Sequence, residues 1–126
     1  MKKKNNQCPK TFILALNDTL NVINGKWKLH IIAALLHGNR RFMEIEKSIP
    51  GINPRMLSKE LKDLEANGVV LRMVYNTTPV SIEYELTSSG KAIEPVLDIM
   101  VAWGLEHRKE FFGDKAIVEE EHDLCN

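Results

Sequence analysis

The stretch from Pro54 to Ala66 constrains this chain more than any other part of its sequence. Its leucines recur at three- and four-residue steps, so they form one apolar face on a helix. Asn53 is a good N-cap, and Pro54 stands at the first helical position, where proline is favoured. Asn67-Gly68 supplies a stop signal. The sequence therefore predicts a helix with one buried face and one polar, outward face.

Patterns on either side of this segment predict the rest of the fold. Apolar residues at helical spacing predict three helices before it, and runs rich in β-branched residues predict two strands of a hairpin after it. The predicted elements are helices over about 9–22, 26–36 and 41–48, strands over 69–75 and 82–86, and one long last helix over 88–112. This order predicts a winged helix-turn-helix, a mainly α fold with a small β-hairpin as its wing.

The charges of the chain are unevenly distributed, although 17 basic and 17 acidic side chains make it neutral overall. Between residues 26 and 62, eight basic side chains stand against three acidic ones, a local charge of +5. From residue 106 onward, seven acidic side chains stand against three basic ones, a local charge of −4. Salt screens charges beyond roughly 10 Å, so the acidic tail does not cancel a distant basic surface. The layout favours a polyanionic partner for the middle of the chain.

The outward face of the helix over 54–66 carries the predicted base-reading residues. A helix of this kind fits the major groove of double-stranded DNA. Arg55 and Lys59 lie near its start, where either could bond guanine O6 and N7, and Met56 could meet a thymine methyl group. The residues expected at the groove are Asn53, Arg55, Met56, Ser58, Lys59 and Lys62. The competing interpretation is an ordinary solvated helix face.

Further basic residues are expected to contact phosphates. Lys26 and Lys28 lie at the predicted start of the second helix, and Arg40 and Arg41 at that of the third. Helix starts favour anions, and basic side chains there add charge-assisted contacts. For Lys28, simple surface exposure is an equally good interpretation. The residues that we assign to phosphate contact are Lys26, Arg41 and, on the first strand, Arg72.

Five segments of the chain form a set of motifs: Asn24-Gly-Lys-Trp-Lys-Leu, Arg41-Phe-Met-Glu-Ile, the run from residue 50 to 70, Ile82-Glu-Tyr-Glu-Leu-Thr-Ser-Ser-Gly, and residues 97–104. In sequence and spacing they resemble the motifs of the HxlR-type regulators, relatives of the MarR group. The resemblance covers residues 18 to about 106 and implies a homodimeric DNA-binding transcription factor whose terminal helices form the dimer interface. The expected interface residues are Leu16, Leu20, Val96, Leu97, Met100 and Trp103. For the last four, an effector pocket is the alternative.

The chain departs from the resembling family at two places. Many members carry a Cys-Pro closer to the signature tryptophan, and in some the cysteine senses oxidants. Here Cys8-Pro9 begins nineteen residues before Trp27, and Leu14 stands at the corresponding place. Ser81 replaces an arginine that is common at the wing, so weaker wing contacts are expected, with Arg72 supplying part of the charge.

Other function classes find little support in the sequence. The histidines are scattered, and no metal-ligand spacing, phosphate-binding loop or catalytic constellation can be assembled, so we expect neither metal, cofactor nor enzymatic activity. The longest apolar run has six residues and no apolar segment follows the basic N-terminus, which predicts a cytoplasmic protein without a membrane span.

Taken together, these features predict one domain over 1–126, with a flexible arm at 1–8, a winged core at 18–86, a dimerisation helix at 88–112 and an acidic tail at 113–126. The predicted function is that of a homodimeric repressor on an inverted-repeat operator. A winged-helix module that binds protein instead of DNA is the alternative. A small-molecule effector, or a thiol switch through Cys8 and Cys125, remains open.

Overall fold

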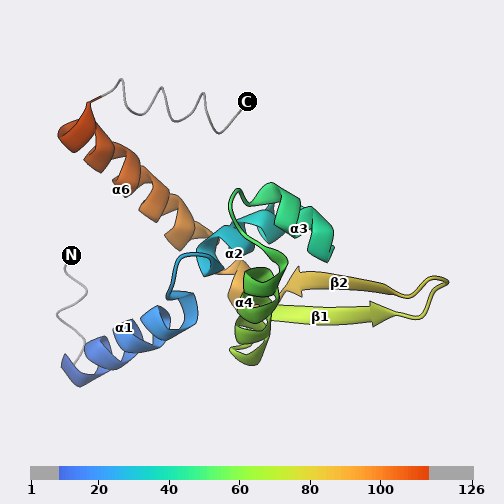
Figure 1. Cartoon of the computed structure of the whole chain (residues 1–126). Helices are drawn as coiled ribbons and strands as arrows, with labels where there is room; N and C mark the ends of the chain where they lie inside the picture. The colour runs from blue at the N-terminus through green and yellow to red at the C-terminus, as the bar shows by residue number, and fades with distance from the viewer. Residues whose placement is uncertain (1–8, 114–126) are drawn as a thin grey trace. The chain divides into compact units, whose positions relative to one another are not determined.

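The computed structural model describes residues 9–113. Their elements, in chain order, are α1 (Pro9–Ile23), α2 (Lys28–Leu36), α3 (Phe42–Ser48), α4 (Pro54–Ala66), β1 (Val70–Tyr75), β2 (Ser81–Leu86), α5 (Ser88–Lys91) and α6 (Glu94–Phe112) (Figure 1). Contacts divide the chain into two units, one ending at Lys91 and the other beginning at Ala92. The predicted mainly α fold with a small antiparallel hairpin is confirmed.

The core of the first unit lies between α2, α3, α4 and the base of the hairpin. Helix α2 contacts both α3 and α4, while α4 packs on β1, and α2 and α3 pack on β2. The predicted apolar face of α4 is fully part of this core. The buried apolar residues are Ile31, Ile32, Ala34, Ile45, Ile49, Ile52, Leu57, Leu61, Leu64, Val69, Val70 and Leu86.

The ends of α4 form as its sequence predicts. The Asn53 side chain accepts a hydrogen bond from the backbone N–H of Met56 at 2.9 Å, and Pro54 follows within the first turn. Beyond the last turn, Gly68 has φ +76°, a conformation that side chains disfavour, and Val69 N–H donates to the carbonyl of Leu64 at 3.0 Å. Both ends are therefore fixed by local hydrogen bonds.

The hairpin joins the helices along β2 as well as at its base. β1 and β2 pair antiparallel, with Val70 opposite Leu86 at the buried end and Tyr75 opposite Ser81 at the other. The N–H of Tyr84 donates to the carbonyl of Arg40 at 2.7 Å, so the backbone before α3 lies along β2. Figure 1 shows the loop end of the hairpin extending away from α3 and α4 as a wing.

The prediction of one continuous last helix is wrong. The structure has a short α5 and a separate α6, with a turn at Ala92 and Ile93 between them. Pro95, in the first turn of α6, explains the break. Proline has no N–H to donate to the carbonyl of Lys91, and its ring would collide with that carbonyl in a regular helix.

A close approach at Gly90 fixes α5 to the turn after α4. A Cβ atom on Gly90 would overlap the carbonyl oxygen of Val69 and lie 3.0 Å from Cδ2 of Leu86. The Thr87 hydroxyl donates to the carbonyl of Gly68 at 2.7 Å and accepts from the N–H of Gly90 at 3.0 Å. The Thr-x-x-Gly segment is thus a structural joint of the first unit.

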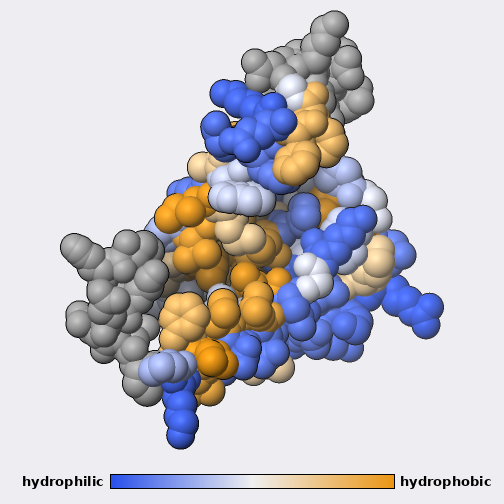
Figure 2. Space-filling view, turned by 90° about the vertical axis from the view of Figure 1, so that its left-hand side faces the viewer, coloured by the Kyte–Doolittle hydropathy of each residue, from blue (hydrophilic) through white to orange (hydrophobic). Residues whose placement is uncertain are grey.

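Helices α1 and α6 leave their apolar side chains exposed. Neither helix has a buried residue in the part of the chain described here. Figure 2 shows broad hydrophobic surface that is open to solvent. The exposed apolar side chains of these helices include Phe12, Ile13, Leu14, Leu16 and Leu20 on α1 and Val96, Ile99, Met100, Val101 and Trp103 on α6.

Candidate nucleic-acid interface

The outward face of α4 presents the predicted cations. Arg55, Lys59 and Lys62 are exposed, on the side opposite the buried leucines. Within residues 9–113, Arg55 and Lys62 form no ion pair, so both charges are available to a ligand. Met56 and Ser58 are half-buried on the flanks of the helix. The sequence therefore identified the polar face of this helix correctly.

Asn53 serves a structural purpose at the start of the same helix. Its Oδ1 atom is occupied by the N–H of Met56, while the residue itself is exposed. The amide nitrogen, a donor, points away from this cap bond by the geometry of the group. Any contact of Asn53 with DNA would therefore use its donor and leave the cap intact.

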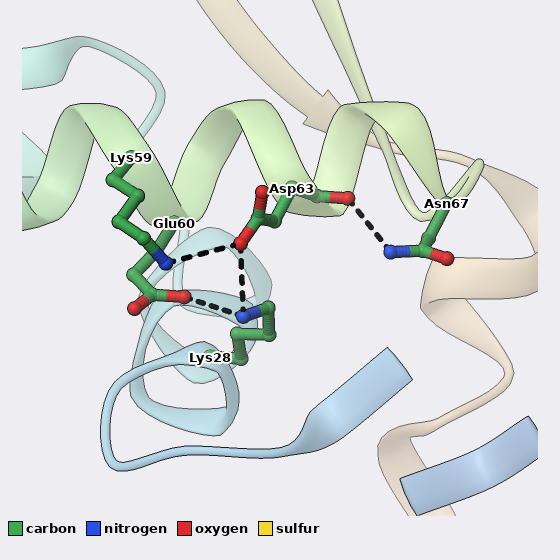
Figure 3. A network of polar contacts seen from close by, with 5 residues as sticks. All are labelled: Lys28, Lys59, Glu60, Asp63 and Asn67. Carbon is green, nitrogen blue, oxygen red and sulfur yellow. Dashed lines mark hydrogen bonds and ion pairs between the residues drawn. The ribbon is translucent and has the colours of Figure 1, made fainter. Parts of the chain in front are cut away.

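Lys28 lies inside the protein and not on its surface. The residue is 5% exposed, and its ammonium donates to Glu60 Oε1 at 2.5 Å and to Asp63 Oδ2 at 3.4 Å (Figure 3). Burial alone lowers the pKa of Lys28, but the hydrogen bonds and charges of Glu60 and Asp63 outweigh it and raise the pKa. Phosphate contact and simple surface exposure are the two interpretations of Lys28 that its sequence position allows, and its burial contradicts both.

Asp63 links this buried lysine to the outward face of α4. Its Oδ2 atom also lies 3.4 Å from the ammonium of Lys59 (Figure 3). Partial burial raises the pKa of Asp63, but the hydrogen bonds from Lys28 and Lys59 outweigh it and lower the pKa. Of the α4 cations, Lys59 therefore has a carboxylate partner, in contrast to Arg55 and Lys62.

Arg40 and Arg41 pair with carboxylates of the wing. Arg40 Nε lies 3.3 Å from Glu83, a second nitrogen of Arg40 pairs with Glu85, and Arg41 lies 3.7 Å from Glu83. The backbone N–H groups of both arginines donate to Glu44, at 3.0 and 3.1 Å, and these bonds lower the pKa of Glu44. The start of α3 is thus already occupied by a carboxylate of its own chain.

These pairs reduce the basic surface expected from the sequence. Asp63, Glu83 and Glu85 lie outside the range 26–62, yet each pairs with a basic residue inside it. Counting these three acids lowers the local charge from +5 to +2. Glu83 and Glu85 are distant in the sequence and are brought beside α3 by β2, whereas Asp63 lies one residue past the end of the counted range.

A cleft lies between the start of α3 and the wing. It has a volume of about 410 Å³ and is lined by Arg41, Thr77, Thr78, Pro79, Val80, Ser81 and Ile82. Arg41, whose side chain is 61% exposed, therefore stands beside the wing loop. Its guanidinium supplies a cation next to Ser81, the position where an arginine is common in the resembling family. Sequence reasoning did not detect this neighbourhood.

The other predicted phosphate contacts are exposed single cations. Helix α2 begins at Lys28 and not at Lys26, which corrects the predicted helix start, because residues 25–27 form a turn. The ammonium of Lys26 lies 4.8 Å from the centroid of the Trp27 ring. Arg72 is exposed on β1, opposite Tyr84, and it forms no ion pair within residues 9–113.

The residues predicted for the dimer interface lie on α1 and α6. Leu16 and Leu20 on α1 are about half exposed, at 48% and 51%. Val96, Met100 and Trp103 on α6 are exposed, and Leu97 is half-buried. The Trp103 ring stacks on His107 of the same helix, with centroids 4.8 Å apart. Cys8 and Cys125, the residues of the possible thiol switch, lie outside the described residues.

No three His, Cys, Asp or Glu side chains within residues 9–113 come together as metal ligands. No helix in the same range is long and apolar enough to cross a membrane.

Comparisons with known proteins place this geometry among regulators. The model of the HxlR-like helix-turn-helix family matches residues 22–111. The HTH-type transcriptional regulator YtcD of Bacillus subtilis (strain 168) is 42% identical over 115 residues, which are 91% of each chain. Its crystal structure matches with a TM-score of 0.67 and 44% identity, covering 73% of this chain and 94% of YtcD. The reduced form of the redox regulator HypR matches with a TM-score of 0.69 and 40% identity, covering 75% and 93%.

Proposed function

The chain belongs to the HxlR-like helix-turn-helix family, whose members in the comparison are transcriptional regulators, and we propose that it is a cytoplasmic repressor. In this proposal it binds double-stranded DNA as a homodimer, on an operator with two-fold symmetry. Repression follows if the operator overlaps a promoter, because the bound dimer then excludes the polymerase. No cofactor, metal or catalytic step is part of the proposal.

The observation that carries the proposal is the outward face of α4. Three exposed cations stand on a helix whose other side is buried and whose start is capped. Such a helix fits a major groove about 12 Å wide and presents its first turns to base edges. We assign Arg55 and Lys59 to base contact, with Asn53, Met56, Ser58 and Lys62 as their neighbours at the groove.

The phosphate contacts that we propose flank α4. Arg41 beside the wing loop, Lys26 before α2 and Arg72 on β1 are exposed cations of the first unit. Each neutralised phosphate adds to the salt dependence of binding and carries no sequence information. Arg41 would first release Glu83, which costs little because the 3.7 Å pair is long and Arg40 also holds Glu83.

The proposed dimer is supported by the apolar faces of α1 and α6. Exposed apolar patches on a soluble chain commonly mark an interface. Two copies related by a two-fold axis would cover these faces and place two copies of α4 about one helical turn of DNA apart, roughly 10 bp or a multiple of it. The side chains that we assign to this interface are Leu16, Leu20, Val96, Leu97, Met100 and Trp103.

Substitution of Arg55 tests most directly whether α4 recognises DNA bases. A duplex of about 30 bp, selected by the protein from a randomised pool, would hold two half-sites. Arg55→Ala should weaken binding to this duplex about tenfold and relax selection at one base step. Lys91→Ala, which removes an exposed cation at the end of α5, is the matched control. Unchanged affinity and unchanged selection in Arg55→Ala would show that Arg55 is not a base reader.

The alternative, a protein-binding winged helix, has one observation in its favour. Two carboxylates of the wing, Glu83 and Glu85, together with Asp63 of α4, lower the local charge to +2. If the protein selects no duplex from the pool and shifts no DNA at low salt, this alternative replaces the repressor.

Regulation by oxidation is a separate part of the proposal. HypR, one of the solved relatives, is a redox regulator. In this chain the candidate thiol is Cys8, with Cys125 as a possible partner in either subunit. Mild oxidant should produce a dimer band on a non-reducing gel, and Cys8→Ser should abolish it. A wild-type band that stays monomeric under oxidant would exclude a bridge between subunits.

A further inference from the structure

Asp63 stands between a buried cation and an exposed one. Its Oδ2 atom lies 3.4 Å from the ammonium of Lys28 and 3.4 Å from that of Lys59. The Lys28 side chain is 6% exposed, whereas that of Lys59 is 70% exposed. Figure 3 shows both contacts meeting at the same carboxylate oxygen. One side chain thus connects the interior with the outward face of α4.

The buried side of this network is held firmly. Lys28 comes from α2, and it binds Asp63 and Glu60, one turn apart on α4. Because Lys28 is buried, its ammonium group cannot move to the surface when DNA binds. The ion pair between Lys28 and Asp63 therefore stays in place. The peptide carbonyl of Asp63 also accepts the Asn67 side chain at 2.9 Å, near the end of the helix. The carboxylate of Asp63 is therefore held on its inner side by Lys28, while its peptide carbonyl belongs to the bonds that end the helix.

The exposed side of the network retains hydrogen-bonding capacity. A lysine ammonium has three N–H donors, so the bond to Asp63 leaves two donors on Lys59. An untethered lysine loses much rotamer freedom when it binds one acceptor. A lysine that is already tethered loses less, and its remaining donors reach a narrower region.

We propose that Asp63 is a specificity-determining residue, which positions Lys59 for one acceptor at a base edge. The proposal rests on the DNA-binding function proposed above. On arbitrary DNA the affinity comes from phosphates, so the negative charge of Asp63 opposes binding. On the preferred sequence, the contact with Asp63 orients the N–H donors of Lys59 before DNA binds. The smaller loss of side-chain entropy on binding then offsets the repulsion between Asp63 and the phosphates. Asp63 therefore separates specific from non-specific binding.

Asp63→Asn tests the proposal with little change of shape. Two probes are used at one salt concentration: the duplex selected by the wild-type protein, and a scrambled duplex of equal length and composition. The variant should bind the scrambled duplex a few-fold more tightly and the selected duplex no more tightly than wild type. The ratio of the two affinities should fall about tenfold, the size expected for one base contact.

Glu65→Gln is the matched control for charge. Glu65 is an exposed acid on the same helix, and it forms no ion pair within residues 9–113. Its removal changes the net charge as Asp63→Asn does, so both affinities should rise by the same factor and their ratio should stay constant. A double-mutant cycle with Lys59→Gln supplies the second control, because Asp63→Asn should have no effect on the ratio in that background.

The outcomes separate the possibilities. If Asp63→Asn changes both affinities as Glu65→Gln does, or if its effect persists in Lys59→Gln, the positioning role is wrong. Should Asp63→Asn fail a thermal unfolding check, Lys59→Gln still allows the proposal to be refuted, since an unchanged ratio in that variant would exclude Lys59 as a base reader that Asp63 positions. A wild-type protein that selects no duplex refutes the proposed function itself, and this is seen before any variant is made.

Discussion

The winged core, α2 to β2, and the terminal helices α1 and α6 differ in how far their apolar side chains are buried. Helices α2, α3 and α4 bury theirs against one another and against the hairpin, down to 0% exposure at Ile31, Ile45 and Leu57. Helices α1 and α6 have equally regular apolar residues, yet none of those described is buried. Regular spacing therefore shows which face will be covered, but not whether the same chain covers it. For α1 and α6, we propose that a second copy does so.

The largest effect should appear on truncation of a core leucine, compared with an exposed side chain of the same winged core. Leu64→Ala removes a side chain with 0% exposure from α4 and should lower the free energy of unfolding by about 2–5 kcal/mol, through lost burial and a cavity. Met43→Ala removes a side chain that is 63% exposed, and it should stay within about 0.5 kcal/mol of wild type. Urea unfolding measures both. Equal effects would mean that the described core is incorrect.

A smaller effect is expected for a side chain added where the core has no room. Gly90→Ala places a Cβ atom against the Val69 carbonyl, so the joint between α5 and the end of α4 must open. We expect a loss of about 1–3 kcal/mol in the free energy of unfolding. Ser89→Ala, at the exposed neighbouring position, is the control. A Gly90→Ala protein as stable as the control would contradict the close approach.

The terminal helices should respond to charge through association. Trp103→Glu places a carboxylate on the apolar face of α6 and should weaken the dimer by roughly 2 kcal/mol or more, about thirtyfold in its dissociation constant. Unfolding of the winged core, followed at concentrations where both proteins are monomeric, should change little. Analytical ultracentrifugation measures the dissociation constant. If the wild-type protein is already monomeric, the proposal that a second copy covers α1 and α6 is wrong.

The smallest expected effect is on the stability of the folded protein at acidic pH. The ordinary pKa values of 3.8 for Asp63 and 4.5 for Glu44 are both lowered in the folded protein. The unfolded chain then binds more protons, so this stabilisation is complete above the ordinary pKa values and is lost as pH falls through the lower, folded ones. The urea concentration at the unfolding midpoint should therefore decrease as the pH is lowered below about 4. This decrease should be less steep in Asp63→Asn and in Glu44→Gln. An identical pH profile in these variants would contradict the assigned pKa shifts.

Local patterns predicted the fold well where the interactions are local. Asn53, Pro54 and Gly68 define the ends of α4 through bonds within a few residues, and the predicted bounds match the structure. The break before α6 also has a local cause, Pro95 in the first turn of that helix. The effect of proline on the preceding carbonyl outweighed the apolar spacing that suggested one helix.

The site was harder to predict, because its electrostatics depend on pairs that are distant in the sequence. Lys28 meets Glu60 and Asp63 only after α2 packs on α4. Arg40 meets Glu83 and Glu85 only after β2 returns along α3. A count of charges along the chain could not contain these pairs, so it overestimated the basic surface. The exposed cations Arg55 and Lys62, in contrast, follow directly from the helix period.

The salt dependence and stoichiometry of DNA binding test the central claim most directly. The wild-type protein should bind its selected duplex as two chains per duplex, and the affinity should fall linearly with salt on logarithmic axes, by about 0.9 per phosphate contacted. With two copies of the cations on α4, Arg41, Lys26 and Arg72, the slope should be steep. Binding of a single chain, or an affinity that does not change with salt, would contradict the account.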